Sequence, residues 1–155
     1  RLARSFQGYT VAKAQDLIGL VVSSISSFGR VYAQNTTDLD AYYKALDENH
    51  LPVAKGVVLT DEDVLRREII QELLCQRHLD IASLQRKYNI DFMTHFSEAI
   101  AALRGMEADG LLVIAPEAIL VNENGYPFLR NICMAFDEYV KGHLQSQTVR
   151  YSKTL

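Results

Sequence analysis

The chain has 155 residues, of which 48% are hydrophobic and 23% are charged, and its formal net charge is −3. This length allows one globular domain, or one domain with part of another, and the composition excludes a disordered or collagen-like chain. The acidic balance argues against a dedicated nucleic-acid binder, and no apolar run reaches the roughly 18 residues of a membrane span.

The N-terminal part of the chain contains short and irregular patterns. Residues 6–11 (FQGYTV) predict a short strand that leads into a loop. Residues 17–25 (LIGLVVSSI) predict a buried strand, because the run is short, apolar and rich in β-branched residues. Thr37 is predicted to cap a helix over residues 38–47, and a short strand is expected at residues 56–59.

Stronger helical patterns follow. Thr60 and the three acids after it predict a capped helix N-terminus, where the helix dipole favours negative charge. Apolar residues then recur at helical spacing. Asp80 is predicted to cap a short helix that ends at Tyr88, and Asp91 is predicted to begin a third helix whose apolar face extends to Leu103.

The pattern ends with a hairpin and a closing helix. Residues 110–114 and 118–121 are short β-branched runs on either side of a Pro-containing turn, which predicts a hairpin. A last helix is expected from residue 125 to about residue 144, with its apolar side chains facing inward. The expected fold is mainly α (α+β), with a winged-helix-like helical domain at residues 60–155 and a separate segment at residues 1–59.

The two cysteines, Cys75 and Cys133, are 58 residues apart and belong to no C-x-x-C or Cys/His group. A zinc or iron–sulfur site therefore cannot be assembled from this chain, and both cysteines are expected to act as small core hydrophobes. A reducing, cytoplasmic compartment is expected. The sequence starts at Arg1 and shows no signal-peptide pattern, so a processed chain or a piece of a longer protein is expected.

Most ionisable side chains of the helical part are expected on solvated surfaces. Arg130, followed by Asn131, is the exception, because an arginine on an otherwise apolar helix is expected to be buried with an ionic partner. The residues expected at the surface are His78, His95, His143, Arg66, Arg67, Arg86 and Lys87.

Two polar groups interrupt the apolar patterns near the N-terminus. Residues 6–10 combine aromatic, amide and hydroxyl side chains, and residues 22–27 mix hydroxyls with apolar residues. Buried hydroxyls and amides need hydrogen-bond partners, and such mixtures often line ligand pockets at strand ends. A plain strand with a polar rim would show the same pattern, so both interpretations stay open.

Four segments occur here in a family's order and spacing: residues 6–10 (FQGYT), 16–20 (DLIGL), 22–26 (VSSIS) and 32–35 (YAQN). Together they resemble the closing part of the barrel of the oxygen-independent coproporphyrinogen III oxidase family, a branch of the radical S-adenosylmethionine enzymes. The likeness covers essentially the whole chain. The first and third segments are the specific ones, since the related haem chaperones carry a different, tryptophan-containing passage there.

The resemblance implies an enzyme that oxidatively decarboxylates two propionates of its substrate, coproporphyrinogen III, to vinyls, giving protoporphyrinogen IX without oxygen. It implies a [4Fe–4S] cluster on a C-x-x-x-C-x-x-C motif and two S-adenosylmethionine molecules. This chain lacks that motif, so it resembles the last third of the enzyme, contributes no metal ligand and is expected to be inactive alone. By position, the resemblance assigns Ile25 to the second S-adenosylmethionine and Phe6 and Gln7 to the active centre.

The sequence departs from the family at Val21, where the family has a glycine, and a side chain there is expected to crowd the ligand or the strand packing. The alternative hypothesis is a winged-helix-like module that binds protein or nucleic acid. Residues 91–104 contain one basic residue against two acids, which argues against a DNA reader. A free-standing structural or regulatory protein is a third hypothesis. No nucleic acid and no membrane are expected as partners, but exposed barrel strands are expected to allow self-association.

Overall fold

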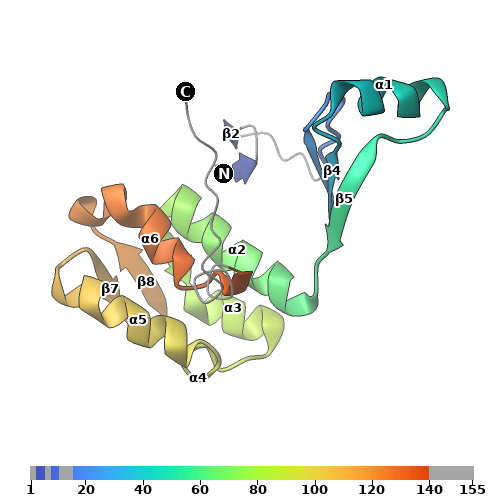
Figure 1. Ribbon diagram of the computed structural model, residues 1–155. Coiled ribbons are helices and arrows are strands. Elements are labelled where there is room, and N and C mark those ends of the chain that lie inside the picture. The colour runs from blue at the N-terminus through green and yellow to red at the C-terminus, as the bar shows by residue number, and fades with distance from the viewer. Residues whose placement is uncertain (1–2, 6–7, 11–15, 140–155) are drawn as a thin grey trace. The chain divides into compact units, whose positions relative to one another are not determined.

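The computed structural model describes residues 3–5, 8–10 and 16–139 and divides into two compact units, Arg1–Val64 and Leu65–Leu155 (Figure 1). The part of the chain that is described contains no helix long and apolar enough to cross a membrane.

The first unit begins with a small antiparallel pair. Strands β1 (Ala3–Ser5) and β2 (Gly8–Thr10) are paired so that Ser5 lies opposite Gly8. Gly8 has a φ of +119°, a backbone conformation that side chains other than hydrogen rarely allow. A strand was expected at residues 6–11, and its described part, β2, confirms the extended backbone there.

A three-stranded antiparallel sheet forms the body of the first unit. It consists of β3 (Ile25–Phe28), β4 (Val31–Asn35) and β5 (Val53–Val58), in the order β3-β4-β5. The pairing of β4 with β5 shifts between Gln34 and Asn35, so one strand carries an extra residue at a β-bulge. Strand β5 is three residues longer at its start than the strand expected at residues 56–59.

Helix α1 (Leu39–Asp47) connects β4 to β5. Its N-cap is Asp38, whose side chain accepts a hydrogen bond from the Ala41 amide at 2.7 Å. The expected cap, Thr37, is therefore wrong by one residue. Both Thr and Asp can cap, and the geometry of the first turn selects the carboxylate.

The prediction of a buried strand at residues 17–25 is wrong. Leu17 forms an isolated bridge with Ser27, and β3 begins only at Ile25. Between them the chain forms a loop, and Ile18, Leu20 and Val21 are exposed by 72%, 78% and 63%. The run has the composition of a strand, but hydrogen bonds to side chains take the place of a sheet ladder.

The second unit contains four helices in succession. They are α2 (Asp61–Gln76), which begins in the first unit, α3 (Ile81–Tyr88), α4 (Phe92–His95) and α5 (Ser97–Ala108). The predicted caps at Thr60, Asp80 and Asp91 are confirmed. The third helix was expected to be continuous, but it breaks at Phe96, which separates α4 from α5.

A small antiparallel sheet completes the second unit. Strand β6 (His78–Asp80) precedes α3, and β7 (Leu112–Ile114) and β8 (Ala118–Val121) form the predicted hairpin after α5. The strand order is β6-β8-β7, so the hairpin pairs with a strand from the first half of the unit. This pairing closes the helices against one sheet.

The closing helix is shorter than the one expected at residues 125–144. A 3₁₀ helix η1 (Glu123–Phe128) with Pro127 inside it precedes α6 (Leu129–Met134). Proline donates no backbone hydrogen bond, which favours the tighter turn at this point. Phe128, expected to face inward, is exposed by 46%, and residues 140–144 lie outside the described part of the chain.

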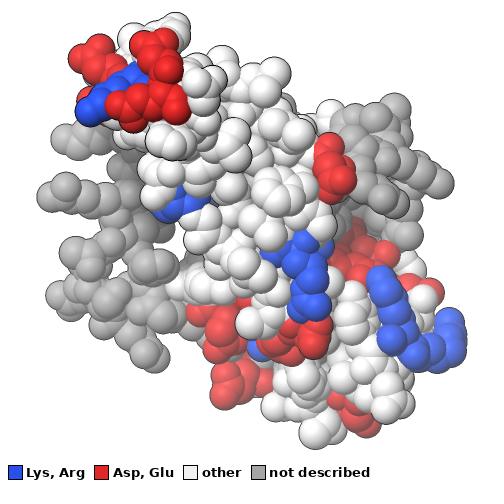
Figure 2. All heavy atoms as spheres, turned by 90° about the vertical axis from the view of Figure 1, so that its right-hand side faces the viewer, with Lys and Arg blue, Asp and Glu red and all other residues white. Residues whose placement is uncertain are grey.

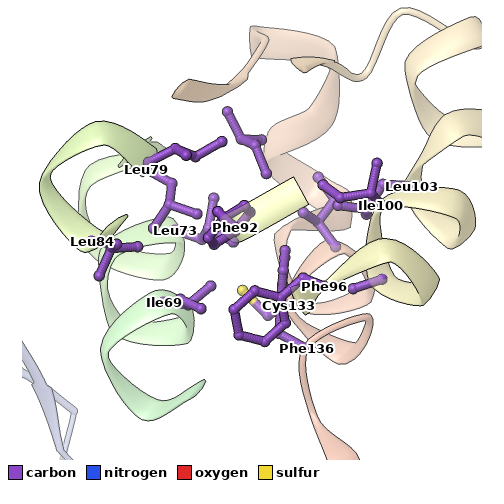
Figure 3. Close-up of a cluster of buried hydrophobic side chains, with 14 of the residues drawn as sticks. Ile69, Leu73, Leu79, Leu84, Phe92, Phe96, Ile100, Leu103, Cys133 and Phe136 are labelled. Atoms are coloured by element: carbon purple, nitrogen blue, oxygen red, sulfur yellow. The ribbon is translucent and has the colours of Figure 1, made fainter. Parts of the chain in front are cut away.

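The core of the second unit collects apolar side chains from every one of its helices and from the hairpin (Figure 3). Phe92, Phe96 and Phe136 are in contact with one another, with ring centroids 4.9 to 6.2 Å apart. Burial of each such side chain contributes roughly 1.5–3 kcal/mol. The members that Figure 3 labels are Ile69, Leu73, Leu79, Leu84, Phe92, Phe96, Ile100, Leu103, Cys133 and Phe136.

Candidate functional site

The most unusual feature of the first unit is a loop that the buried side-chain amide of one residue holds in place. Asn35, at the end of β4, is one of two polar side chains, with Ser26, that are buried among the described residues. Its amide Nδ2 donates to the carbonyl oxygens of Gly19 and Val21 at 3.2 and 3.0 Å and to Ser24 Oγ at 3.2 Å. These bonds hold residues 18–24, here called the apolar loop, against the sheet.

Gly19 is fixed on both sides. Its N–H donates to the buried Ser26 Oγ at 3.0 Å, and its carbonyl accepts from Asn35. A Cβ at this position would lie 2.5 Å from Ser24 Oγ, so a glycine is needed for the close approach. The loop is therefore packed against its own hydroxyl group as well as against the sheet.

Helix α1 and Thr36, which follows β4, supply two further bonds. The Tyr42 hydroxyl of α1 donates to the Leu20 carbonyl at 2.5 Å. The amide of Ser23, which has a φ of +60°, donates to the Thr36 carbonyl at 2.7 Å. Both of these bonds hold backbone atoms of the loop, while the side chains of Ile18, Leu20 and Val21 stay exposed.

The surface beside this loop carries little charge. The three strands of the sheet contain one charged residue, Lys55. In the view of Figure 2, charged atoms gather at the top, at the place of α1, and white atoms form a broad surface below them. A rigid, exposed and apolar loop on an uncharged surface is suited to contact another apolar surface or ligand.

The residues expected at the active centre are placed in part. Ile25 is the first residue of β3, lies opposite Gln34 and is partly buried. Phe6 and Gln7 lie outside the described residues. Val21 neither has a positive φ nor points inward, so within this unit its side chain does not crowd the strand packing.

Asn35 and Tyr42 were missed as functional candidates at the sequence level. Asparagine is depleted in strands, and Asn35 closes a strand-like run, so a buried structural amide could have been considered. Tyr42 and its neighbour Tyr43 gave no signal that distinguished a hydrogen-bonding tyrosine from a surface one. Tyr42 is buried, whereas Tyr43 is exposed.

In the second unit, Arg66 corrects the expectation of a solvated helix face. Its side chain is only 17% exposed, donates to the Phe136 carbonyl at 3.1 Å and pairs with Glu138 at 3.1 Å. Its guanidinium also lies 5.1 Å from the centre of the Phe96 ring. These contacts tie α2 to the segment after α6. Arg66 lines a cavity whose rim also carries Glu98, and the two acids offset its charge.

A second cluster joins α2 to α3. Lys87 Nζ and the Tyr88 hydroxyl both donate to Glu68, at 2.6 and 2.5 Å. The hydrogen bond with Glu68 raises the pKa of Lys87, while burial and then the same carboxylate raise the pKa of Tyr88. The cluster stabilises the helix pair at neutral pH and does not form a nucleophile or a metal site.

The remaining predicted positions divide between surface and core. His78 and His95 are exposed as expected, and His143 lies outside the described residues. Arg130 was expected to be buried, but it is exposed because α6 buries its opposite face. Cys133 is buried as expected, whereas Cys75 is only half-buried, and neither forms a disulfide. No group of three metal-binding side chains occurs in the part of the chain that is described.

Comparison with known proteins identifies relatives along the chain. Residues 59–128 match the HemN C-terminal domain family. The chain is 40% identical to the oxygen-independent coproporphyrinogen III oxidase of Helicobacter pylori over 154 residues, which is 99% of the chain and 33% of that protein. It is 38% identical to the Escherichia coli protein of the same name over 94% of the chain and 32% of the relative.

A solved structure shows the same relationship. The structure described as Escherichia coli coproporphyrinogen III oxidase, a radical SAM enzyme, matches with a TM-score of 0.86 and 38% identity. The match covers 89% of this chain and 32% of that one. The chain thus spans about a third of the length of the relatives that it matches.

Proposed function

The chain belongs to the oxygen-independent coproporphyrinogen III oxidase family, and from this premise we propose that it supplies the C-terminal part of such an enzyme. The observation that carries the proposal is identity of about 40% along 99% of the chain, together with the structural match. The reaction converts two propionates of coproporphyrinogen III to vinyls. Each conversion releases carbon dioxide, a hydrogen atom, which the radical derived from S-adenosylmethionine takes up, and one electron, which passes to an external electron acceptor. The product belongs to haem biosynthesis.

The cofactors of this reaction divide between this chain and the rest of the enzyme. A [4Fe–4S] cluster does not fit here, because the sequence has two distant cysteines and the described residues contain no metal-binding group. S-adenosylmethionine fits better, since the apolar loop and the partly exposed Ile25 offer an apolar wall to a ligand with apolar and charged parts. When bound to a cluster, S-adenosylmethionine supplies the radical that begins the oxidation.

We propose that Ile25 forms part of the wall for the second S-adenosylmethionine, and that Phe6 and Gln7 lie at the active centre. An aliphatic side chain excludes water, and an amide can both donate to a carboxylate and accept from an ammonium group. Ile25→Asp is expected to abolish binding of the second S-adenosylmethionine, because an unpaired carboxylate would face that ligand's own carboxylate. Gln7→Ala is expected to impair positioning of the ligand more than folding.

We also propose that the domain boundary lies at residues 59/60 and that the second unit is winged-helix-like. The order helix, strand, three helices, hairpin and the pairing of β6 with β8 support this proposal. Arg104, the one basic residue in residues 91–104, pairs with Glu107, and residues 110–121 contain no Lys or Arg. This charge pattern argues against a nucleic-acid reader.

The first unit is proposed to be the end of a radical S-adenosylmethionine barrel, to which β3–β5 is an antiparallel addition, because barrels of this type are built from parallel strands. Strand β5 is exposed at every residue and lies at the edge of its sheet. The isolated chain is therefore expected to self-associate through this edge. Two free thiols support a reducing, cytoplasmic location.

A chimera tests the proposed function. The C-terminal third of the Escherichia coli enzyme is replaced by this chain, and the purified chimera with its reconstituted cluster is assayed anaerobically for protoporphyrinogen IX. The chimera is expected to form product, whereas this chain alone and the truncated enzyme alone are not. A chimera that folds and retains its cluster, but makes no product and binds no second S-adenosylmethionine, would contradict the proposal.

A further inference from the structure

We propose that Asn35 is a positioning residue for ligand binding at the apolar loop, and that Tyr42 supports it. The inference rests on the proposed function and adds residues that do not themselves contact the ligand. Asn35 acts through the loop, which leads directly into Ile25 at the start of β3.

The bond pattern argues for a purpose beyond packing. Asn35 is 6% exposed, and its amide donates to three acceptors that all belong to the apolar loop. Its own backbone N–H donates to the Ser24 carbonyl at 3.0 Å. One buried residue thus fixes three positions of the loop. Burial of a polar amide is costly unless all of its hydrogen bonds are made.

The apolar loop presents exposed apolar side chains on a backbone that is held by hydrogen bonds. Ile18, Leu20 and Val21 are more than half exposed although hydrogen bonds hold the backbone at Gly19, Leu20 and Val21. A backbone held in this way and carrying outward apolar side chains is pre-organised, and a ligand or surface that meets it loses less entropy on binding.

The position of Ile25 connects the loop to the reaction. Ser24 accepts from Asn35 through both its hydroxyl and its carbonyl, and Ile25 follows it directly. A shift of the loop therefore moves Ile25 relative to the rest of β3. Loss of the bonds from Asn35 is expected to displace the wall of the S-adenosylmethionine site while the sheet stays paired.

The test compares Asn35→Asp with Asn122→Asp. The first change places a carboxylate oxygen against the Gly19 and Val21 carbonyls, which can only accept. Asn122 makes the matched control, because its Nδ2 donates to the Gly110 carbonyl at 2.9 Å in a turn of the second unit. Tyr42→Phe, which keeps the buried ring, is the milder second variant.

Two measurements are made on each protein. Hydrogen exchange on this chain reports the loop: Asn35→Asp and Tyr42→Phe are expected to speed exchange at residues 19–24 and to leave the second unit unchanged. In the chimera, S-adenosylmethionine binding reports the site: Asn35→Asp is expected to weaken the second equivalent about tenfold or more, with the cluster and the first equivalent retained. Tyr42→Phe is expected to weaken it less, and Asn122→Asp not at all.

The outcomes separate this inference from the proposed function. An active chimera in which Asn35→Asp speeds exchange but binds both equivalents normally would show that Asn35 is structural only. Loss of both equivalents and of the cluster together would also indicate a general structural role and overturn the inference. A wild-type chimera that folds but binds no second equivalent would overturn the proposed function, and the inference with it.

Discussion

Replacement of Gly125 by alanine is expected to destabilise the second unit strongly. Gly125 is buried in η1, and a Cβ at this position would lie 2.1 Å from the Leu111 carbonyl oxygen and 2.8 Å from Val121 Cγ1. To restore van der Waals contact, that oxygen would have to move by more than about 1 Å. The oxygen cannot move freely, because it accepts a hydrogen bond from the backbone N–H of Asn122 at 2.9 Å, and this bond anchors the hairpin to η1.

The magnitude follows from the kind of neighbour. Overpacking against side chains costs typically about 1–3 kcal/mol, and the rigid carbonyl at Gly125 places the expected loss at or above about 3 kcal/mol. Gly105→Ala is the matched control: its Cβ would meet nothing within 4 Å, on an exposed position of α5. Alanine there is expected to stabilise by about 0.5–1 kcal/mol, because glycine is a poor helix former.

Thermal and urea unfolding of both variants, followed by helical circular dichroism, measures the two effects. The expected result is opposite signs for the same chemical change. If Gly125→Ala unfolds within about 0.5 kcal/mol of the wild type, a margin typical of surface substitutions, the tight packing between η1 and the hairpin is refuted. A loss of stability in Gly105→Ala would equally count against the assignment of its position as open space.

Three further predictions concern stability. Arg66→Ala is expected to destabilise the second unit by about 1.5–3 kcal/mol, because its charged hydrogen bonds are lost. The control, Arg86→Ala, changes an exposed residue and is expected to cost less than about 0.5 kcal/mol. Equal losses of unfolding free energy in urea would contradict this prediction. The Ile114 N–H, and after it Arg104, lowers the pKa of Glu107. The stability that the ionised carboxylate contributes is therefore present above the ordinary glutamate pKa of about 4.3 and is lost as the pH falls further. Glu107→Gln is expected to flatten the acid unfolding curve, and an unchanged curve would contradict this prediction. Limited proteolysis is expected to leave a resistant core that begins at about residue 60, and uniform digestion would contradict this boundary.

The helical unit was predictable because its local signals agree with its tertiary contacts. Asp80 and Asp91 cap their helices as the pattern indicates, and the apolar spacing after Thr60 gives the residues of the core. The break at Phe96 was not predictable, because the apolar spacing continues across it. Only the packing of the Phe96 ring against Phe92 and Phe136 decides that the backbone turns there.

The loop before β3 was not predictable for the opposite reason. Residues 17–25 have a strand composition, and what prevents a strand is a side chain ten residues further on, Asn35. A distant hydrogen-bonding partner leaves no local pattern. The family resemblance did identify the segment as important, but it drew attention to Ile25 and not to the amide that holds its neighbours.

The β-bulge in β5 has a consequence for changes in chain length. Gln34 pairs with Lys55 and Asn35 with Val53, so Ala54 is the additional residue. Its deletion would leave both pairings and the faces of β5 unchanged, because Val53 and Lys55 already lie opposite adjacent residues of β4, and would remove the bend and extra twist that a bulge gives a strand. The connection through α1, by contrast, joins two strand ends outside the ladder, where insertions are tolerated. Insertions are therefore expected to be tolerated in the turn after α1, at residues 49–51, whereas deletion of Ala54 is expected to straighten β5 without changing its register.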